Sequence, residues 1–320
     1  MKKLGRTGLK VSEICLGCMT FGNQADEATS AAIVRRAVDA GVNFLDTANS
    51  YNGGLSEEYT GKALKGIRDD VVLATKVYNV TGSGPNDRGL SRRHIMRAVE
   101  DSLRRLQTDN LDLYQVHRFD VETPLEETLR VLDDLVHQGK VRYLGCSNYA
   151  AWQLGKALRT SERHNLFRYE CIQPRFNLIS RSIEAELLPL CLDEGVGVIV
   201  YNPLAAGLLT GKHHRESGPV EGSRFDTNAM YRDRYWSDRS FDAVDRLREI
   251  AESTGHSMAK LSIAWVLANP AITAAILGAS RPDQLDETLA ATQITLSTEH
   301  MAQLDELWSI VGRYETPRQA

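Results

Sequence analysis

The sequence predicts an α/β protein of the (β/α)₈ TIM-barrel class. Eight short apolar runs rich in Val, Ile, Leu and Tyr recur along the chain, and helical patterns separate them. Strands that alternate with helices over a whole chain are typical of a parallel sheet, and continuous apolar strands are buried on both faces. A doubly wound sheet is the alternative, but no GxGxxG motif follows the first strand. At 320 residues, the chain 1–320 fits one such domain.

The expected strands follow one another at the spacing of barrel units. They cover residues 14–17, 43–48, 71–77, 111–117, 141–147, 169–174, 196–203 and 273–278. Between them, helical patterns cover residues 29–40, 92–106, 125–137, 152–161, 183–194 and 282–291. Apolar residues recur every three or four positions in these segments, which is typical of a helix with one buried face.

Three segments fall outside this repeat. Residues before Ile14 form a predicted hairpin that turns at Arg6-Thr7-Gly8 and caps the bottom of the barrel. After the seventh strand comes a long segment, 205–240, rich in Gly, Arg, Tyr and Asp, which we expect to be a functional loop such as a lid. Two helical patterns then stand where one is expected, and a last helix closes the chain; these cover residues 241–254, 258–268 and 298–311.

Composition excludes several classes of function. With 38 Lys+Arg and 42 Asp+Glu, the net charge is −4, so the chain has no excess of positive charge that would indicate binding to nucleic acid or to an anionic membrane. No apolar run approaches the ~20 residues of a membrane span, and the start MKKLGRTGLKV lacks the apolar core of a secretory signal. Five cysteines, an odd number, indicate buried thiols in a reducing compartment, so we expect a cytoplasmic protein.

Polar residues stand at the ends of three successive strands, where a barrel has its active site. They are Asp46, Lys76 and His117, with Tyr51 in the loop after Asp46. Each alone is explained by capping, solvation or packing, but together they suit the reduction of a carbonyl. A phenol with a pKa near ~10 is a poor acid; we expect a buried ammonium to lower that value, a carboxylate to hold the ammonium charged, and an imidazole to bind the same oxygen.

This pattern resembles the aldo-keto reductase superfamily across nearly the whole chain. The motifs are Leu16-Gly17 with Met19-Thr20-Phe21-Gly22, Asn43-Phe44-Leu45-Asp46-Thr47-Ala48 with Tyr51, Ala74-Thr75-Lys76, Leu111-Asp112-Leu113-Tyr114-Gln115-Val116-His117, Gly139-Lys140-Val141-Arg142, Gly145-Cys146-Ser147-Asn148, Tyr201-Asn202-Pro203-Leu204 and Gly278-Ala279-Ser280. The resemblance implies NADP(H) binding and reversible reduction of aldehydes or ketones. It also implies Tyr51 as the general acid, tuned by Lys76 and Asp46, with His117 orienting the carbonyl.

The resemblance is closest to the branch that holds bacterial aldo/keto reductases and potassium-channel β subunits. The latter commonly have Asn at the catalytic His position, whereas His117 is present here, which favours catalysis. The chain departs from the family pattern at Asn202, Leu277 and Thr288, where many members have Ser, Pro and Asn.

The resemblance also implies a cofactor site, with Ser147, Asn148 and Gln173 on the carboxamide and Tyr201 stacked on the nicotinamide. The remaining cofactor positions are Cys18, Met19, Gln24, Asp46, Asn202, Pro203, Leu204, Ala205, Gly207, Leu209, Lys212, Arg224, Gly278, Ser280, Arg281, Gln284 and Glu287. A cationic Ser280-Arg281 pair favours the 2′-phosphate of NADPH over NADH.

Family positions place the carbonyl substrate among six residues: Met19, Tyr51, Tyr78, His117, Arg118 and Trp236. Tyr231 and Tyr235 of the lid are also available. Arg118 is suited to attract a hydroxyl or an anionic group; the alternative is an ion pair with Asp120, Asp46 or the lid carboxylates. The sequence does not identify the substrate, and a homo-oligomer stays open.

Three other functions compete with a reductase. The first is an NADPH-binding regulatory or redox-sensing subunit with slow turnover. The second is a lyase with Lys76 as a Schiff-base nucleophile, which Asp46 disfavours because it keeps that amine charged. The third is a metal hydrolase; His213 and His214 are adjacent in the lid without a motif partner, so we expect solvated side chains and no metal.

Overall fold

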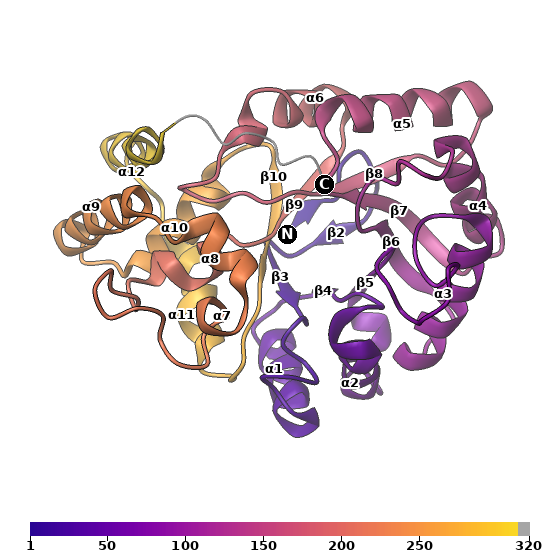
Figure 1. Ribbon diagram of the computed structural model, residues 1–320, viewed down its shortest axis with the longest axis horizontal. Helices are drawn as coiled ribbons and strands as arrows, with labels where there is room; N and C mark the ends of the chain where they lie inside the picture. Colours follow the sequence, from indigo (N-terminus) through magenta and orange to yellow (C-terminus); the bar gives the residue numbers. More distant parts are fainter. Residues whose placement is uncertain (313–320) are drawn as a thin grey trace.

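In the computed structural model, which describes residues 1–312, eight parallel strands close into a barrel (Figure 1). They are β3 (Ile14–Gly17), β4 (Phe44–Asp46), β5 (Val72–Val77), β6 (Leu111–Val116), β7 (Val141–Ser147), β8 (Tyr169–Gln173), β9 (Gly197–Val200) and β10 (Ile272–Leu277). The last strand pairs with the first, with Ala275 opposite Ile14. The predicted (β/α)₈ barrel is confirmed.

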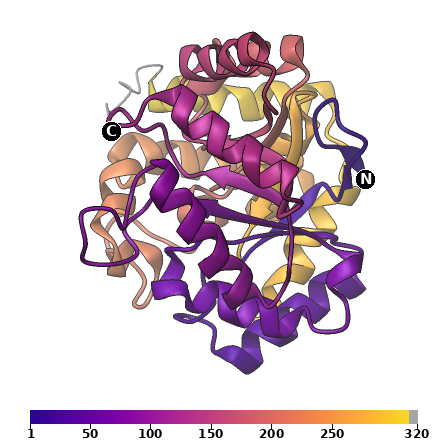
Figure 2. The same cartoon turned by 90° about the vertical axis from the view of Figure 1, so that its right-hand side faces the viewer.

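A two-stranded antiparallel hairpin of β1 (Lys2–Lys3) and β2 (Lys10–Val11) precedes the barrel. The Arg6 amide donates to the Gly195 carbonyl (2.8 Å), just before β9 begins. Gly5, with φ +58°, packs so tightly on the backbone of Gly195 and Gly197 that a Cβ would clash. The hairpin therefore covers the amino-terminal end of the barrel, opposite the lid segment (indigo and orange in Figure 2), as the sequence predicted.

Helices surround the strands. The first six α-helices are α1 (Glu27–Asp39), α2 (Leu55–Ala63), α3 (Arg92–Leu106), α4 (Leu125–His137), α5 (Ala151–His164) and α6 (Leu187–Glu194). Side chains of Asp26 and Ser91 accept from backbone amides of α1 and α3 and so fix where these helices begin. Short 3₁₀ turns stand at Tyr51–Gly54 (η1), Arg68–Asp70 (η2) and Ser182–Glu184 (η3).

The lid segment, residues 205–240, is more helical than the sequence indicated. It contains the 3₁₀ turn η4 (Ala205–Thr210), α7 (Arg224–Thr227) and α8 (Ala229–Tyr235). It leads into α9 (Asp238–Thr254), α10 (Met258–Ala268), α11 (Gln284–Ala290), η5 (Ala291–Gln293) and α12 (Thr298–Val311), which gather on one side of the barrel (Figure 1). Since α10 packs on β10 while α9 packs on α12, α9 and α12 are the additional helices.

Side chains inside the barrel form an apolar layer with a polar layer above it. On β5, alternate residues Val72 and Ala74 belong to the interior cluster, and Lys76 is the next residue on that face. The same step of two leads from Phe44 to Asp46 and from Leu113 to Gln115. Strand periodicity therefore places the polar side chains inside the barrel at its carboxyl end.

All five cysteines lie in the core as free thiols. Cys15 and Cys171 belong to the barrel interior, and Cys18, Cys146 and Cys191 pack between strands and helices. Burial raises the pKa of every one of them, to about 12 for Cys18 and Cys191. These thiols are therefore structural core side chains.

Candidate active site

Asp46 and Lys76 form a buried ion pair at the carboxyl end of β4 and β5. The ammonium of Lys76, with a fully buried side chain, donates to Asp46 Oδ1 and to the Thr47 carbonyl oxygen (2.7 Å). Burial opposes the charge on Lys76, but Asp46 and Tyr51 together outweigh that effect and the pKa of Lys76 lies above its ordinary value. Lys76 is therefore a permanent cation, which disfavours a Schiff-base nucleophile as the sequence analysis argued.

Tyr51 lies beside this pair on η1. Its hydroxyl is 3.4 Å from Lys76 Nζ, and the ammonium stands 5.0 Å from the ring centroid. The expected lowering of its pKa is wrong: burial raises the pKa of Tyr51, and the opposing effect of Lys76 does not cancel it. Tyr51 therefore keeps its proton at neutral pH, with a cation in place to stabilise the phenolate that forms when the proton leaves.

His117 completes the group on the side of β6. Its ring meets that of Tyr51 edge to face, with centroids 5.8 Å apart. Burial and the charges of Lys76 and Arg118 lower the pKa of His117 to about 3, so the imidazole is neutral. The amide nitrogen of Asn79 lies 3.2 Å from Nδ1 and donates to it, which assigns the ring proton to Nε2. His117 thus offers an N–H donor.

Gln115 is a site residue that the sequence analysis missed. Its Nε2 and that of Gln173 each donate to Asp46 Oδ2 at 2.9 Å, so the carboxylate of Asp46 is held from two further strands. Gly145 on the next strand makes the room, since a Cβ there would lie 3.1 Å from Gln115 Cγ. Counting the alternation of β6 from Leu113 would have found this residue.

Four predicted cofactor residues form one hydrogen-bonded chain across β7, β8 and β9. Tyr201 donates to Asn148 Oδ1 (2.8 Å), Asn148 Nδ2 donates to Ser147 Oγ (2.9 Å), and Ser147 donates to the Gln173 carbonyl (2.7 Å). Asn148, with φ +57°, also donates to the His117 carbonyl (2.9 Å), which ties this chain to the predicted catalytic group.

Three predicted cofactor cations come together beside the lid. The ammonium of Lys212 lies against Gly207, and the guanidinium of Arg224 lies against Gly278 at the end of β10. Burial, Arg224 and Arg281 all lower the pKa of Lys212, as expected where like charges gather. Arg281 pairs with Asp283 (3.2 Å), a carboxylate that the sequence analysis did not place near this end of the site.

The segment from Asn202 to Lys212 has an unusual backbone. Asn202, Ala205 and Ala206 have φ values of +56°, +48° and +60°, followed by Gly207 at +103°. Asn and Ala have no β branch and tolerate such values at a cost, so this turn is suited to bring the backbone close to a neighbour. Pro203, Ala205 and Leu209 are buried, whereas Leu204 is half-buried.

The other predicted cofactor residues flank this segment. Ser280 donates through its amide to Gln284 Oε1 (2.8 Å), while Glu287 is exposed. Gln24 reaches across to the Gly222 carbonyl of the lid (3.4 Å). Met19 is half-buried beside Asn52, which donates to its carbonyl oxygen (2.9 Å), whereas the Cys18 side chain is enclosed in the core.

Aromatic side chains of the lid pack on one another. Trp236, which we expected in the substrate pocket, contacts the rings of His213, Phe225 and Phe241, with centroids 5.0–5.6 Å apart, and no ring contact within residues 1–312 joins it to Tyr51. Tyr231 is the lid residue whose phenol acts on the pKa of Tyr51, after burial and the Lys76–Asp46 pair.

His213 is not solvated, contrary to the prediction, whereas its neighbour His214 is exposed. Its ring packs edge to face on Phe225 with centroids 4.9 Å apart, and burial, Lys212 and His214 lower its pKa to about 4. The ring neighbours of His213, Phe225 on α7 and Trp236 directly after α8, explain the difference. His213 is thus part of the lid's own core.

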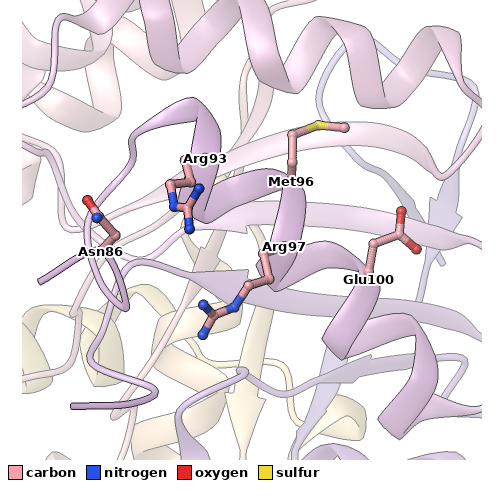
Figure 3. A pocket seen from close by; sticks show the side chains of 5 residues that line it. All are labelled: Asn86, Arg93, Met96, Arg97 and Glu100. Atoms are coloured by element: carbon pink, nitrogen blue, oxygen red, sulfur yellow. The ribbon is translucent and has the colours of Figure 1, made fainter. Parts of the chain in front are cut away.

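Other kinds of site receive no support from residues 1–312. No three His, Cys, Asp or Glu side chains in that range gather in a way that could hold a metal ion, and none of its helices is long and apolar enough to cross a bilayer. A surface hollow over α3, lined by Asn86, Arg93, Met96, Arg97 and Glu100 (Figure 3), contains none of the strand-end residues.

Comparison with known proteins agrees with this geometry. The model of the aldo/keto reductase family matches residues 13–309. An uncharacterized oxidoreductase of Bacillus subtilis, YrpG, is 40% identical over 98% of this chain and 97% of its own length. A probable voltage-gated potassium channel subunit beta of Oryza sativa is 39% identical over 92% and 91%. Versiconal hemiacetal acetate reductase of Aspergillus parasiticus is 37% identical over 95% of both chains.

Proposed function

Because the chain belongs to the aldo/keto reductase family and is an oxidoreductase, we propose that it reduces an aldehyde or ketone to the alcohol with NADPH, reversibly. The observation that carries the proposal is the group formed by the buried Asp46–Lys76 pair with the half-buried Tyr51 and His117. We also propose that residues 1–320 act as one domain, and that the protein works in the cytoplasm, where free thiols persist.

Two donors converge on the position of the carbonyl oxygen. Tyr51 holds a proton because burial raises its pKa, and His117 presents Nε2–H because its neutral ring accepts at Nδ1. As the carbonyl oxygen gains electron density, Tyr51 transfers its proton to it and Lys76 stabilises the phenolate that remains. Asp46, held by Gln115 and Gln173, keeps that ammonium oriented during the transfer.

The residues present fit a dinucleotide phosphate. Lys212, Arg224 and Arg281 are the cations for its phosphate groups, and the strained turn at Ala205–Gly207 leaves backbone close by. Tyr201 offers a ring face to the planar nicotinamide, and the side-chain amides of Asn148 and Gln173 suit its carboxamide group. When bound, the reduced nicotinamide supplies the hydride that the carbonyl carbon receives. We propose NADPH as the preferred form because Arg281 matches a 2′-phosphate better than a hydroxyl.

A titration with NADPH and NADH, followed in the same cuvette by a panel of aldehydes and ketones, tests the proposal. We expect NADPH to quench the protein fluorescence at a lower concentration than NADH does. We also expect NADPH to be oxidised once a carbonyl compound is added. Tight binding without turnover across the panel would instead favour a regulatory subunit, the class to which some relatives' names refer. Absence of binding would overturn the cofactor assignment.

A further inference from the structure

We propose that Asn79 is a positioning residue, whose side-chain amide joins the turn of Tyr51 to the ring of His117 and keeps the ring proton on Nε2, toward the carbonyl. The inference rests on the reductase function proposed above and deepens it, because it names what orients one of the two donors at the carbonyl oxygen. Asn79 is not among the site residues that the sequence predicts.

Asn79 comes two residues after β5, where the chain leaves the barrel. The preceding residue, Tyr78, has a φ of +149°, which is rare for a residue with a side chain. The Gly89 amide donates to the Tyr78 carbonyl oxygen (2.8 Å) and closes the loop that follows. The backbone beside Asn79 is therefore fixed by a hydrogen bond across the base of that loop.

The side-chain amide of Asn79 contacts two elements at once. Its Nδ2 lies 3.2 Å from Oγ of Ser50, the residue directly before Tyr51 and η1, and 3.2 Å from Nδ1 of His117 after β6. Since an amide nitrogen carries two hydrogens, one group in one orientation makes both contacts. Asn79 thus links the two residues that meet at the carbonyl oxygen, Tyr51 through its neighbour and His117 directly.

The backbone of His117 is held independently of its ring. Its amide donates to the Val77 carbonyl oxygen (2.8 Å), and its own carbonyl oxygen accepts from Asn148 Nδ2 (2.9 Å). The edge-to-face contact with Tyr51 restricts where the ring lies, but a neutral imidazole in that place has two tautomers. The hydrogen bond from Asn79 distinguishes them, because only an unprotonated Nδ1 accepts it.

The charges around the ring do not choose between the tautomers. Burial, Lys76 on β5 and Arg118 all oppose a charge on the imidazole of His117 and so keep it neutral. Arg118 itself is exposed and stands over the ring of Tyr78, 5.5 Å from the centroid, while Tyr51 on η1 keeps its own proton. A neutral ring has one proton, so its transfer to Nδ1 would turn Nε2 from a donor into an acceptor. The carbonyl oxygen would then lose one of its two donors.

Asn79→Asp reverses the hydrogen bond with little change in shape. A carboxylate accepts the proton of the Ser50 hydroxyl, so the loop stays anchored, but it requires a proton on Nδ1 of His117. Asn86→Asp is the matched control, since it adds the same charge to the same loop at an exposed position in the surface hollow over α3 (Figure 3). Long-range ¹H–¹⁵N NMR spectra of the ring, assigned with His117→Gln, report which nitrogen carries the proton.

We expect a protonated Nε2 in the unmodified enzyme and in Asn86→Asp, and a protonated Nδ1 in Asn79→Asp. With 4-nitrobenzaldehyde and saturating NADPH at pH 8, kcat should fall about 10²-fold in Asn79→Asp and less than about twofold in the control. The new carboxylate should also raise the pKa of His117, and an imidazolium has a proton on both nitrogens. The deficit relative to the unmodified enzyme should therefore shrink to about tenfold or less as the pH falls to 5, in step with the His117 titration.

These measurements separate the inference from the reductase proposal, because the ring proton is observed without turnover. A protonated Nδ1 in the unmodified enzyme, or a proton that stays on Nε2 in Asn79→Asp, would show that the inference is wrong, whereas aldehyde reduction would still support the reductase. A tautomer change without loss of kcat, or an equal loss in Asn86→Asp, would likewise refute the positioning role. If no aldehyde is reduced but the tautomer changes as expected, the reductase proposal loses support and the control of the ring proton by Asn79 stands.

Discussion

The two halves of the barrel mouth differ in how their charges are neutralised. On the side of β4, β5 and β6, Lys76 is paired with Asp46 and every group of the pair is held by further hydrogen bonds. On the side of β9, β10 and the lid, Lys212 and Arg224 gather without a carboxylate of their own in the described chain, and Arg281 has only the exposed Asp283.

The difference separates groups that react from groups that bind. A buried pair that is already neutral and rigid costs nothing to reorganise during a reaction, so it suits proton transfer. Cations that repel one another in the free protein gain from an incoming anion, so they suit phosphate binding. The side of β9, β10 and the lid, whose cations lack carboxylate partners, is therefore the side suited to bind a ligand.

Tyr51→Phe should impair proton transfer on the side of β4, β5 and β6 without affecting cofactor binding. It removes the proton donor but leaves the ring and Lys76 in place, so we expect kcat for carbonyl reduction to fall about 10³-fold. NADPH affinity, measured by fluorescence titration, should change less than about twofold, since the phosphate cations are untouched. A variant with full kcat would show that Tyr51 is not the acid.

Arg281→Ala should weaken NADPH binding on the side of β9, β10 and the lid without affecting proton transfer. Loss of a guanidinium from the 2′-phosphate should raise the Kd for NADPH about tenfold or more while NADH changes little. Arg248→Ala, which removes a half-buried guanidinium paired with Asp245, is the control. Equal losses for NADPH and NADH would refute the contact with the 2′-phosphate.

Gln24→Ala should loosen the lid without touching either charge group. The Gln24 amide reaches the Gly222 carbonyl at 3.4 Å, a long and exposed hydrogen bond, so its loss should raise the NADPH dissociation rate only a few-fold. Stopped-flow fluorescence after displacement by excess NADP⁺ measures that rate. An unchanged rate would show that this contact does not retain the cofactor.

His117 should show no protonation change at all near neutrality. Its pKa of about 3 lies below the ordinary value, so the ring stays neutral from pH 8 down to about pH 5 and charges only in stronger acid. NMR titration of the histidine ring protons, with His117→Gln to assign the His117 resonance, should find that this resonance does not shift in that range. A midpoint near the ordinary value of ~6.5 would contradict the assignment of a neutral ring to His117.

Much of the fold could be predicted because strand and helix periods are local. Strands β3 and β7 and helices α3, α4 and α12 have the predicted bounds. The seventh strand ends at Val200, earlier than predicted, because the Asn202 backbone turns to positive φ and Pro203 has no amide to continue the ladder. The short helices α7 and α8 were missed, since four and seven residues give too little periodicity.

The site was harder to predict where it depends on distant neighbours. Placement of Asp46 and Lys76 follows from strand ends, but Gln115 was passed over inside an apolar motif. The pKa of Tyr51 depends on how far burial outweighs one ammonium, which only the packed structure defines. The burial of His213 and the inward packing of Trp236 likewise require contacts with Phe225 and Phe241.

Housing every cysteine in the core has a chemical consequence for a protein that handles carbonyl compounds. Aldehydes and other electrophiles attack thiolates, and reaction requires both ionisation and access. Here burial denies both, because all five thiols are enclosed and their pKa values lie well above neutrality. The native enzyme should therefore resist self-inactivation by its own reactants, and mass spectrometry after exposure to iodoacetamide should find the five cysteines alkylated only once the chain is unfolded.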